Sequence, residues 1–233
     1  MTGPHLTAPA ATRIVYADGR EGEGSCPVLR ELHLRLLCNG RELGSFACTD
    51  TDVENLVLGW LYTQGWIDAA DQVASMEIQR RQNVAAVTLT GPLPEQRRPL
   101  ERIPAGPAWK PEDVFTLAAR FRQGMPIHDE TGATHSCFLM RGGEIVYAFE
   151  DLSRHNAVDK AVGFALKGGI PLGECLLYTS GRLPEEQVRR AAAAGIGVLV
   201  SKATPTAEAV ELARTLGVTL LCRAWEDRFE RFA

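Results

Sequence analysis

Polar side chains crowd one short segment, EDLSRHNAVDK, which covers residues 150–160 and runs directly into an apolar stretch of helical periodicity. The N-terminus of a helix attracts anions because of its free N–H groups and its dipole. An arginine there can hold phosphate oxygens through two hydrogen bonds, and histidine or asparagine can bond to a base or pterin edge. The segment therefore indicates a phosphate-bearing ligand, with Arg154, His155 and Asn156 as candidate contacts.

Two further loops of this kind follow, each between an expected strand and an expected helix. Ligands of open α/β sheets bind beyond the carboxyl ends of the strands, next to helix N-termini. Three such loops at one sheet edge favour a site for a phosphate-bearing ligand. Pro184 is expected at the first position of its helix. The candidate contacts in these two loops are Ser180, Gly181 and Arg182 in TSGRLP and Thr204, Pro205 and Thr206 in KATPTAE.

A plainer interpretation is open for each loop alone. Serine and threonine commonly cap helices, and exposed charges are usually solvated. On this interpretation Ser180 and Thr204 are caps, Arg182 is solvated, Asp159 and Lys160 are surface charges, and His155 is a structural histidine.

His135, in THSCF, is expected to begin an inner strand and to point at the same region. A zinc deaminase would need an HxE segment and a later PCxxC. Here the position two after His135 is Cys137, and the sequence has no PCxxC. Zinc deamination is therefore not predicted, and no metal site is expected.

The overall composition limits the partners. The chain has 233 residues and a formal net charge of -4, with a pI near 5.8. This balance argues against nucleic acid and anionic membranes as partners. The N-terminus lacks the pattern of a signal peptide, and the longest apolar run, 191–200, is too short to span a bilayer, so we expect a cytoplasmic protein. The six cysteines form no CxxC, and most of them are expected in the core.

The elements that position these residues fall into two expected domains. The first, residues 12–104, is a smaller α+β domain. Short strands run from Arg13 to Cys48, with Asn39-Gly40 as a two-residue hairpin turn. A helix capped by Thr51 and Glu54 follows and ends at Gly65, before the strands VASMEIQ and VAAVTLT. The proline-rich stretch 91–110 is expected to be a linker.

The second expected domain, residues 111–233, is an α/β layer sandwich with a partly parallel sheet, in an order that fits the cytidine-deaminase-like arrangement. A helix over 111–123 precedes a hairpin across Gly142-Gly143. Helices and strands then alternate. The expected helices are 156–167, 184–194 and 205–216, and the expected strands are ECLLYTS, IGVLVS and residues 218–222.

Several motifs match a known family in order and spacing. They are TGATHSC, EDLSRHNAVDKAVGFAL, TSGRLPEEQVRRAAAAGIGVLVSKATPTAEAVELARTLGVTLL and AWEDRF, with TDTDVENLVLGWLYTQGWI nearer the N-terminus. From about Ile14 to Phe229 the chain resembles the FdhD family of formate dehydrogenase accessory proteins.

The resemblance implies a sulfurtransferase or sulfur carrier, with a deaminase-like C-terminal domain and a homodimeric state. Such a protein passes persulfide sulfur from a cysteine desulfurase to molybdenum bis(molybdopterin guanine dinucleotide) before this cofactor enters formate dehydrogenase. A guanine nucleotide fragment would be a simpler ligand. The implied cofactor contacts are His135, Arg154, His155, Asn156, Asp159, Lys160, Ser180, Gly181, Arg182, Thr204, Pro205, Thr206, Trp225 and Arg228. Near the last two, Trp225 replaces a family arginine and Glu226-Asp227 replace glycine-rich chain, which would weaken an anion contact.

The family's CGxCG-type cysteine loop is missing here. The corresponding stretch, RRPLERIPAGPAWKPED, holds no cysteine, although sulfur transfer needs an accessible thiolate. Cys137 is the candidate catalytic stand-in and Cys48 a second one; the opposing expectation is a buried strand thiol. Three hypotheses stay open: sulfur transfer through an unconventional cysteine, a non-catalytic cofactor chaperone or regulator, and an unrelated nucleotide-binding module.

Overall fold

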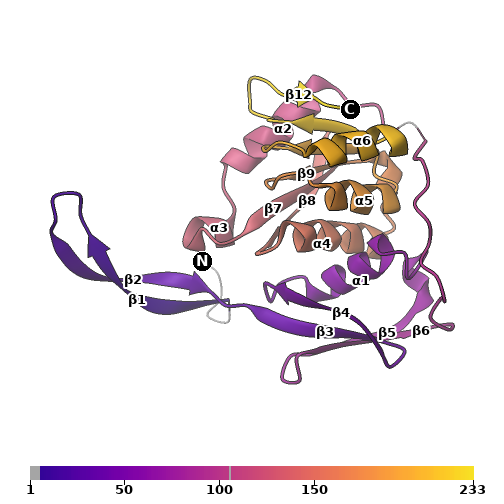
Figure 1. Ribbon diagram of the computed structural model, residues 1–233, viewed down its shortest axis with the longest axis horizontal. Coiled ribbons are helices and arrows are strands. Elements are labelled where there is room, and N and C mark those ends of the chain that lie inside the picture. The colour runs from indigo at the N-terminus through magenta and orange to yellow at the C-terminus, as the bar shows by residue number, and fades with distance from the viewer. Residues whose placement is uncertain (1–5, 105) are drawn as a thin grey trace.

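The computed structural model describes residues 6–104 and 106–233. These residues form a body of two sheets with helices between and around them, and a hairpin arm that projects from the body (Figure 1). In the part of the chain so described, no helix is long and apolar enough to cross a membrane.

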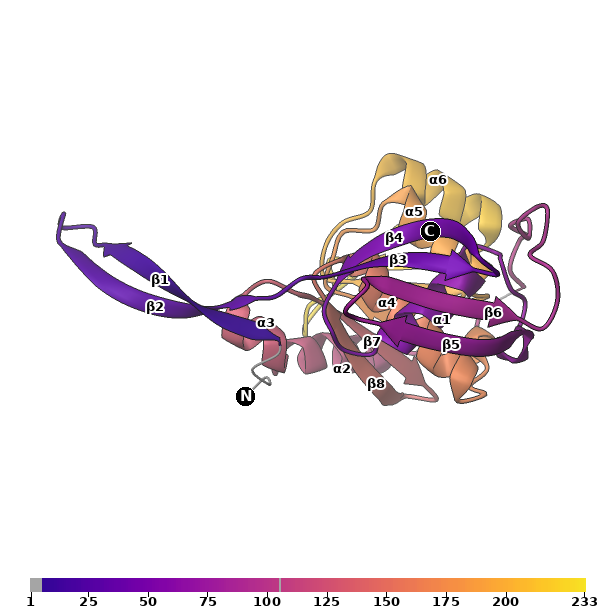
Figure 2. The same cartoon turned by 90° about the horizontal axis from the view of Figure 1, so that it is seen from below.

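The arm consists of strands β1 (Thr7–Val15) and β2 (Glu21–Leu29), which pair antiparallel along their whole length. Gly19, with φ of +84°, lies in the turn at the tip. The view from below shows the arm standing clear of both sheets (Figure 2). The sequence predicted strands from Arg13 onward; the first of them begins six residues earlier, at Thr7.

The smaller sheet has the strand order β4-β3-β6-β5. Its strands are β3 (Leu32–Cys38), β4 (Arg41–Cys48), β5 (Val73–Gln79) and β6 (Val84–Leu89). The predicted Asn39-Gly40 turn joins β3 to β4, and both residues have positive φ, as a type I′ turn requires. A short 3₁₀ turn, η1 (Ala70–Gln72), precedes β5.

Helix α1 (Val53–Thr63) covers one face of this sheet. Its apolar residues Leu56, Val57 and Leu61 are fully buried, and Gly65 follows with φ of +73° at the predicted stop. The predicted cap at Thr51 is wrong. Asp52, in the left-handed region, precedes the helix without a side-chain cap bond, because the Thr51 hydroxyl is hydrogen-bonded elsewhere, to Thr49 and Lys160.

The larger sheet has the order β12-β11-β10-β9-β7-β8. The parallel strands β9, β10 and β11 continue into the antiparallel hairpin of β7 and β8, which confirms the predicted α/β class with a partly parallel sheet. The strands are β7 (His135–Arg141), β8 (Glu144–Asp151), β9 (Cys175–Thr179), β10 (Val198–Ser201), β11 (Thr219–Cys222) and β12 (Glu230–Arg231).

Helices cover both faces of the larger sheet. Alternate residues point to opposite sides: Leu177 and Leu199 pack under three helices, whereas Tyr178 and Val200 face a fourth helix on the other side (Figure 1). The three are α4 (Arg154–Lys167), α5 (Glu185–Ala193) and α6 (Ala207–Leu216), and the fourth is α2 (Pro111–Arg122). The sequence did not predict the short helix α3 (Pro126–Thr131), the 3₁₀ turn η2 (Leu172–Glu174) or β12.

The two sheets are joined where α1 packs against α4. A Cβ added to Gly59 would lie 1.8 Å from the carbonyl oxygen of Asp159, and one added to Gly163 would lie 1.9 Å from that of Asn55. The backbones of the two helices are therefore in direct contact, which only glycine allows. We call this contact, with the polar groups around it, the seam.

The stretch 91–110 follows the surface between the two sheets. Arg98 N donates to Gly65 O at 3.0 Å, and Ile103 N donates to Leu216 O at 2.8 Å. In its described residues this linker has no helix or strand, as predicted. It is nevertheless hydrogen-bonded both to the part of the chain that forms the smaller sheet and to the part that forms the larger one.

Candidate functional site

The three polar loops do lie at one edge of the larger sheet. Strands β8, β9 and β10 run in the same direction, and the loops follow their carboxyl ends, where the antiparallel β7 begins at His135. The loops also contact each other: Leu183 N donates to Thr204 O at 3.2 Å and Thr206 N to Leu183 O at 3.1 Å. We call this region the ligand edge; it confirms the arrangement expected from the strand order.

The first turn of α4 places Arg154 and His155 at the ligand edge. Helix α4 begins two residues before the predicted start, because Ser153 caps it by accepting a bond from His155 N at 3.3 Å. Gly181 lies against this turn: a Cβ there would be 2.7 Å from Arg154 Cδ. The absence of a side chain at position 181 therefore leaves room for the arginine.

Two nitrogen atoms in this turn are buried and have no hydrogen-bond partner among the described residues, Arg154 Nε and His155 Nε2. The closest acid, Glu186 Oε2, is 3.7 Å from His155 Nε2, which is beyond hydrogen-bond length. Buried polar atoms are normally paired, and a ligand is one way to pair them.

Burial keeps the two histidines of the ligand edge neutral. It lowers the pKa of His155 to about 4, with Arg190 and Arg154 adding to the effect. Burial and the charge of Arg154 also lower the pKa of His135. His135 Nδ1 lies 3.4 Å from Ser180 Oγ, which accepts a bond from Ser136 N at 3.0 Å. A neutral imidazole can donate and accept, as recognition of a base or pterin edge requires.

Asn156 and Lys160 are buried and face the interior of the protein. The ammonium of Lys160 is fully buried and lies 2.7 Å from Asp151 Oδ2. It also donates to Thr49 Oγ1 at 2.7 Å and to Glu150 O at 3.0 Å. Asn156 Nδ2 donates to Ala47 O and to Asp151 Oδ1 at 2.8 and 2.9 Å. These groups connect β4 to the end of β8, so the structure gives both residues partners inside the protein.

Asp159 is likewise occupied within the seam. Its carboxylate is fully buried, accepts a bond from Thr63 Oγ1 at 2.7 Å and pairs with Arg190 at 3.2 Å. Burial raises its pKa, while Arg190 and Thr63 oppose that shift. The interpretation of Asp159 and Lys160 as surface charges is wrong, because neither side chain reaches the surface. Their implied role as ligand contacts stays a prediction.

The remaining candidates lie in the outer part of the ligand edge. Arg182 and Thr204 are exposed, and Pro205 is half-buried. Thr206 is the cap of α6, since its hydroxyl accepts a bond from Ala209 N at 3.2 Å. Ser180 caps no helix; its bond to Ser136 instead ties β9 to β7. Pro184 precedes α5 and is not its first residue.

The C-terminal segment contributes an exposed aromatic residue. Trp225 is 41% exposed, and Trp225 N donates to Arg228 O in a turn. The charges here already have partners: Arg228 pairs with Asp227 at 3.2 Å, and Glu226 pairs with Arg122 at 2.7 Å. This pairing agrees with the expectation that the segment is a weak contact for an anion.

The cysteine candidates differ sharply in exposure. Burial raises the pKa of the Cys137 thiol well above its usual range, and it raises the pKa of Cys48 to about 12. Both placements favour the expectation of core thiols. Among the described residues, Cys26 is the one exposed cysteine, on strand β2 of the arm. Its neighbours in EGEGSCPV are glycine, acids and proline, a composition that indicates exposure and sets it apart from the expected core cysteines.

Comparisons with known proteins show which family this chain matches. The model of the FdhD/NarQ family matches residues 29–106 and 95–233. A protein of Halalkalibacterium halodurans named sulfur carrier protein FdhD is 30% identical over 218 residues, covering 82% of this chain and 81% of its own length. A protein of the same name from Staphylococcus aureus is 29% identical over 228 residues, with 88% and 86% covered.

A solved structure has the same fold. It is the crystal structure of a protein from Desulfotalea psychrophila assigned as a formate dehydrogenase accessory protein. Its TM-score to this chain is 0.83 at 26% sequence identity, and the match covers 97% of this chain and 96% of that one.

Proposed function

The chain belongs to the FdhD/NarQ family, and on this premise we propose that it serves formate dehydrogenase maturation in the cytoplasm by binding molybdenum bis(molybdopterin guanine dinucleotide) at the ligand edge. The cofactor is here a cargo that the protein binds and passes on. A guanine nucleotide, which is one fragment of it, would occupy the same edge.

The observation that carries this proposal is a pair of buried nitrogen atoms, Arg154 Nε and His155 Nε2, for which the described part of the chain offers no hydrogen-bond partner. They lie on the first turn of a 14-residue helix, where the helix dipole favours a phosphate. Arg182 adds an exposed guanidinium on the neighbouring loop to the half-buried one of Arg154. Cationic, dipolar and neutral imidazole groups together suit a ligand that combines phosphates with a heterocycle.

The test is a calorimetric titration of the full-length protein with GDP. We expect binding by the wild type and a loss of about 1.5 to 3 kcal/mol of binding free energy in Arg154→Ala and in Arg182→Ala, as for lost charge-assisted hydrogen bonds. Lys167→Ala, at the exposed opposite end of α4, is the matched control and should bind as the wild type does. Equal affinities in all four proteins would remove the ligand edge as the site.

Two mechanisms remain for the sulfur. In the first, the chain accepts persulfide sulfur from a cysteine desulfurase, and Cys26 is then the thiol that the structure leaves accessible. In the second, the chain binds the cofactor without carrying sulfur. Burial of Cys137 and Cys48 and the absence of cysteine from the linker favour the second.

Persulfide mapping separates the two mechanisms. The protein is incubated with a cysteine desulfurase and cysteine, alkylated, and analysed by mass spectrometry, with Cys26→Ser and Cys137→Ser as controls. A persulfide on Cys26 that disappears in Cys26→Ser would establish a sulfur carrier. Unmodified cysteines would establish a binding protein, and a persulfide on Cys137 would contradict the burial argument.

A further inference from the structure

The end of strand β4 is tied to the end of β8 through one residue, Thr49. Thr49 directly follows β4 and is fully buried. Its backbone N–H donates to Asp151 Oδ2 at 3.1 Å, and its hydroxyl oxygen lies 3.1 Å from the same carboxylate oxygen. The two residues are 102 positions apart in the chain, so the contact joins the first half of the protein to the strand that leads into the ligand edge.

Asp151 is the residue on which these bonds converge. Its side chain is fully buried, and Oδ2 also pairs with the ammonium of Lys160 at 2.7 Å. The other oxygen, Oδ1, accepts from Ser153 N at 3.0 Å and from Asn156 Nδ2 at 2.9 Å. One carboxylate therefore holds together the end of β4, the turn before α4 and the first turn of α4.

The hydroxyl of Thr49 has a defined part in this group. Lys160 donates to it at 2.7 Å, so its oxygen is an acceptor on that side. A hydroxyl has a single proton to donate. Asp151 Oδ2 at 3.1 Å is a charged acceptor and is closer than the carbonyl oxygen of Glu150 at 3.3 Å. The hydroxyl of Thr51, 3.0 Å away, has a proton of its own and can donate to Thr49. The Thr49 proton therefore goes to Asp151.

These bonds fix the place where α4 begins. Ser153, which Asp151 holds, caps the helix by accepting a bond from His155 N at 3.3 Å. Arg154 lies between these two residues. It packs closely on Gly181, where an added Cβ would be 2.7 Å from Arg154 Cδ. A shift of the turn would therefore move the guanidinium and the imidazole together.

We infer that Thr49 is a positioning residue for the ligand edge. Its side chain is fully buried, so it acts through Asp151, which sets the first turn of α4 and with it the placement of Arg154 and His155. The smaller sheet thereby takes part in binding without lining the site. The inference rests on the proposed function, because it names a residue needed for binding at that same site.

The first test compares two variants of Thr49 in the full-length protein. Thr49→Val removes the hydroxyl and keeps the backbone bond to Asp151, whereas Thr49→Ser keeps the hydroxyl as well. In a calorimetric titration, the affinity for GDP should fall about fivefold or more in Thr49→Val. Thr49→Ser should bind GDP as the wild type does. Equal affinities in the wild type and Thr49→Val would overturn the inference, and so would a serine variant that binds as weakly as the valine variant.

Thr63→Val separates positioning from stability. Thr63 is also buried in the seam, and its hydroxyl donates to the buried carboxylate of Asp159 at 2.7 Å. The same substitution therefore removes the same kind of bond, but beyond the first turn of α4. Thr63→Val should lose stability as Thr49→Val does and should keep the wild-type affinity for GDP. An equal loss of affinity in both variants would overturn the inference, because destabilisation alone would then explain it.

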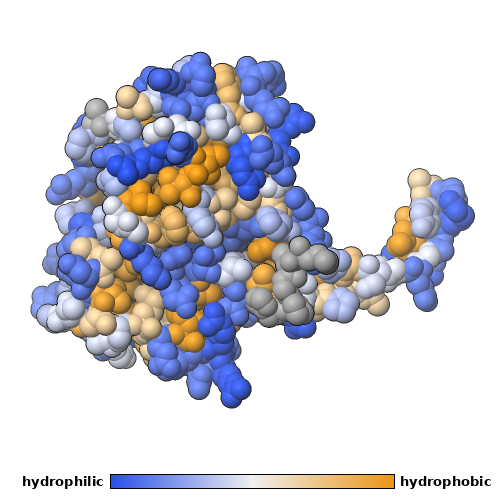
Figure 3. Space-filling view, turned by 180° about the vertical axis from the view of Figure 1, so that it is seen from behind, coloured by the Kyte–Doolittle hydropathy of each residue, from blue (hydrophilic) through white to orange (hydrophobic). Residues whose placement is uncertain are grey.

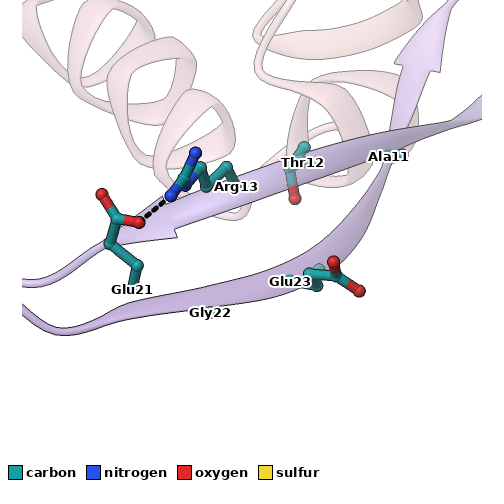
Figure 4. A pocket seen from close by; sticks show the side chains of 7 residues that line it. Ala11, Thr12, Arg13, Glu21, Gly22 and Glu23 are labelled. Carbon is teal, nitrogen blue, oxygen red and sulfur yellow. Dashed lines mark hydrogen bonds and ion pairs between the residues drawn. The ribbon is translucent and has the colours of Figure 1, made fainter.

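Thr12→Val is a second matched control, at a site outside the body. Thr12 lies on the arm, next to the ion pair of Arg13 and Glu21 (Figure 4). The arm extends away from the body in the view from behind (Figure 3). Thr12→Val should therefore match the wild type both in its affinity for GDP and in its thermal midpoint. A loss of affinity equal to that of Thr49→Val would overturn the inference.

Hydrogen exchange of the backbone amides of residues 153–157 reports on the turn without any ligand. These amides should exchange faster in Thr49→Val than in Thr63→Val or the wild type. Unchanged exchange in Thr49→Val would overturn the inference. A wild type that binds no GDP would remove the proposed function and the ligand role of Thr49 with it, and faster exchange would then still show that Thr49 holds the turn. Failure of the inference alone would appear as GDP binding by a wild type whose turn and affinity do not respond to Thr49→Val.

Discussion

Two parts of helix α4 carry similar residue types and have opposite surroundings. In the first turn, Arg154 and His155 lie at the ligand edge with buried nitrogen atoms that lack partners among the described residues. Further along, Asp159 and Lys160 lie in the seam, fully buried and paired with Arg190 and Asp151. The comparison teaches that residue type does not separate a binding group from a structural one. The presence of a protein partner does.

The largest effect should come from breaking the seam at Lys160. Lys160→Met removes the buried ammonium and leaves Asp151 as a buried carboxylate without its cation. We expect a loss of about 3 to 5 kcal/mol in the free energy of unfolding, measured by urea denaturation. Lys167→Met, at the exposed end of the same helix, should stay within about 0.5 kcal/mol of the wild type. Similar losses of unfolding free energy in both variants would show that the buried ion pair of Lys160 does not stabilise the fold.

A smaller effect should come from separating the helices without touching a charge. Gly163→Ala places a methyl group 1.9 Å from Asn55 O, so α1 and α4 must move apart. We expect the free energy of unfolding to fall by about 1 to 3 kcal/mol, as for overpacking in a core. Gly173→Ala is the control, since its added Cβ meets no atom closer than 3.7 Å. An unchanged midpoint of urea denaturation in Gly163→Ala would mean that the two helices can move apart at little cost in stability.

A separate effect should appear as a pH dependence of the ligand edge. In the unfolded chain His155 takes up a proton near its ordinary pKa of 6.5, whereas in the folded chain its pKa is lowered to about 4. Between these values the unfolded state binds more protons, so stability falls as the pH drops through this window. His155→Asn should make the decline measured by thermal unfolding from pH 7 to 4 shallower. An identical slope would remove His155 as its source.

Local sequence rules predicted much of this fold. Turn chemistry placed the Asn39-Gly40 hairpin, and helical periodicity located α1 and the three helices on the larger sheet. The shared edge of the three loops followed from strand direction alone. These features depend on short-range preferences, which are written in adjacent residues.

The failures concern contacts between distant segments. Thr51 has the pattern of a cap, but its hydroxyl bonds to Lys160, 109 residues away. Asp159 and Lys160 looked like helix surface because α1, which buries this side of α4, comes from the first half of the chain. The exposed position of Cys26 depends on the arm leaving the body, which strand patterning alone did not predict.

The glycine contact between α1 and α4 also bears on the order of folding. Gly59 and Gly163 are separated by about a hundred residues, so the seam is a contact between remote parts of the chain. Contacts of this kind form slowly because a long loop must close first. During synthesis the smaller sheet and α1 emerge well before α4, and the bare glycine side of α1 stays open until then. Docking of the two helices is accordingly the step at which the N-terminal half of the protein acquires its final cover.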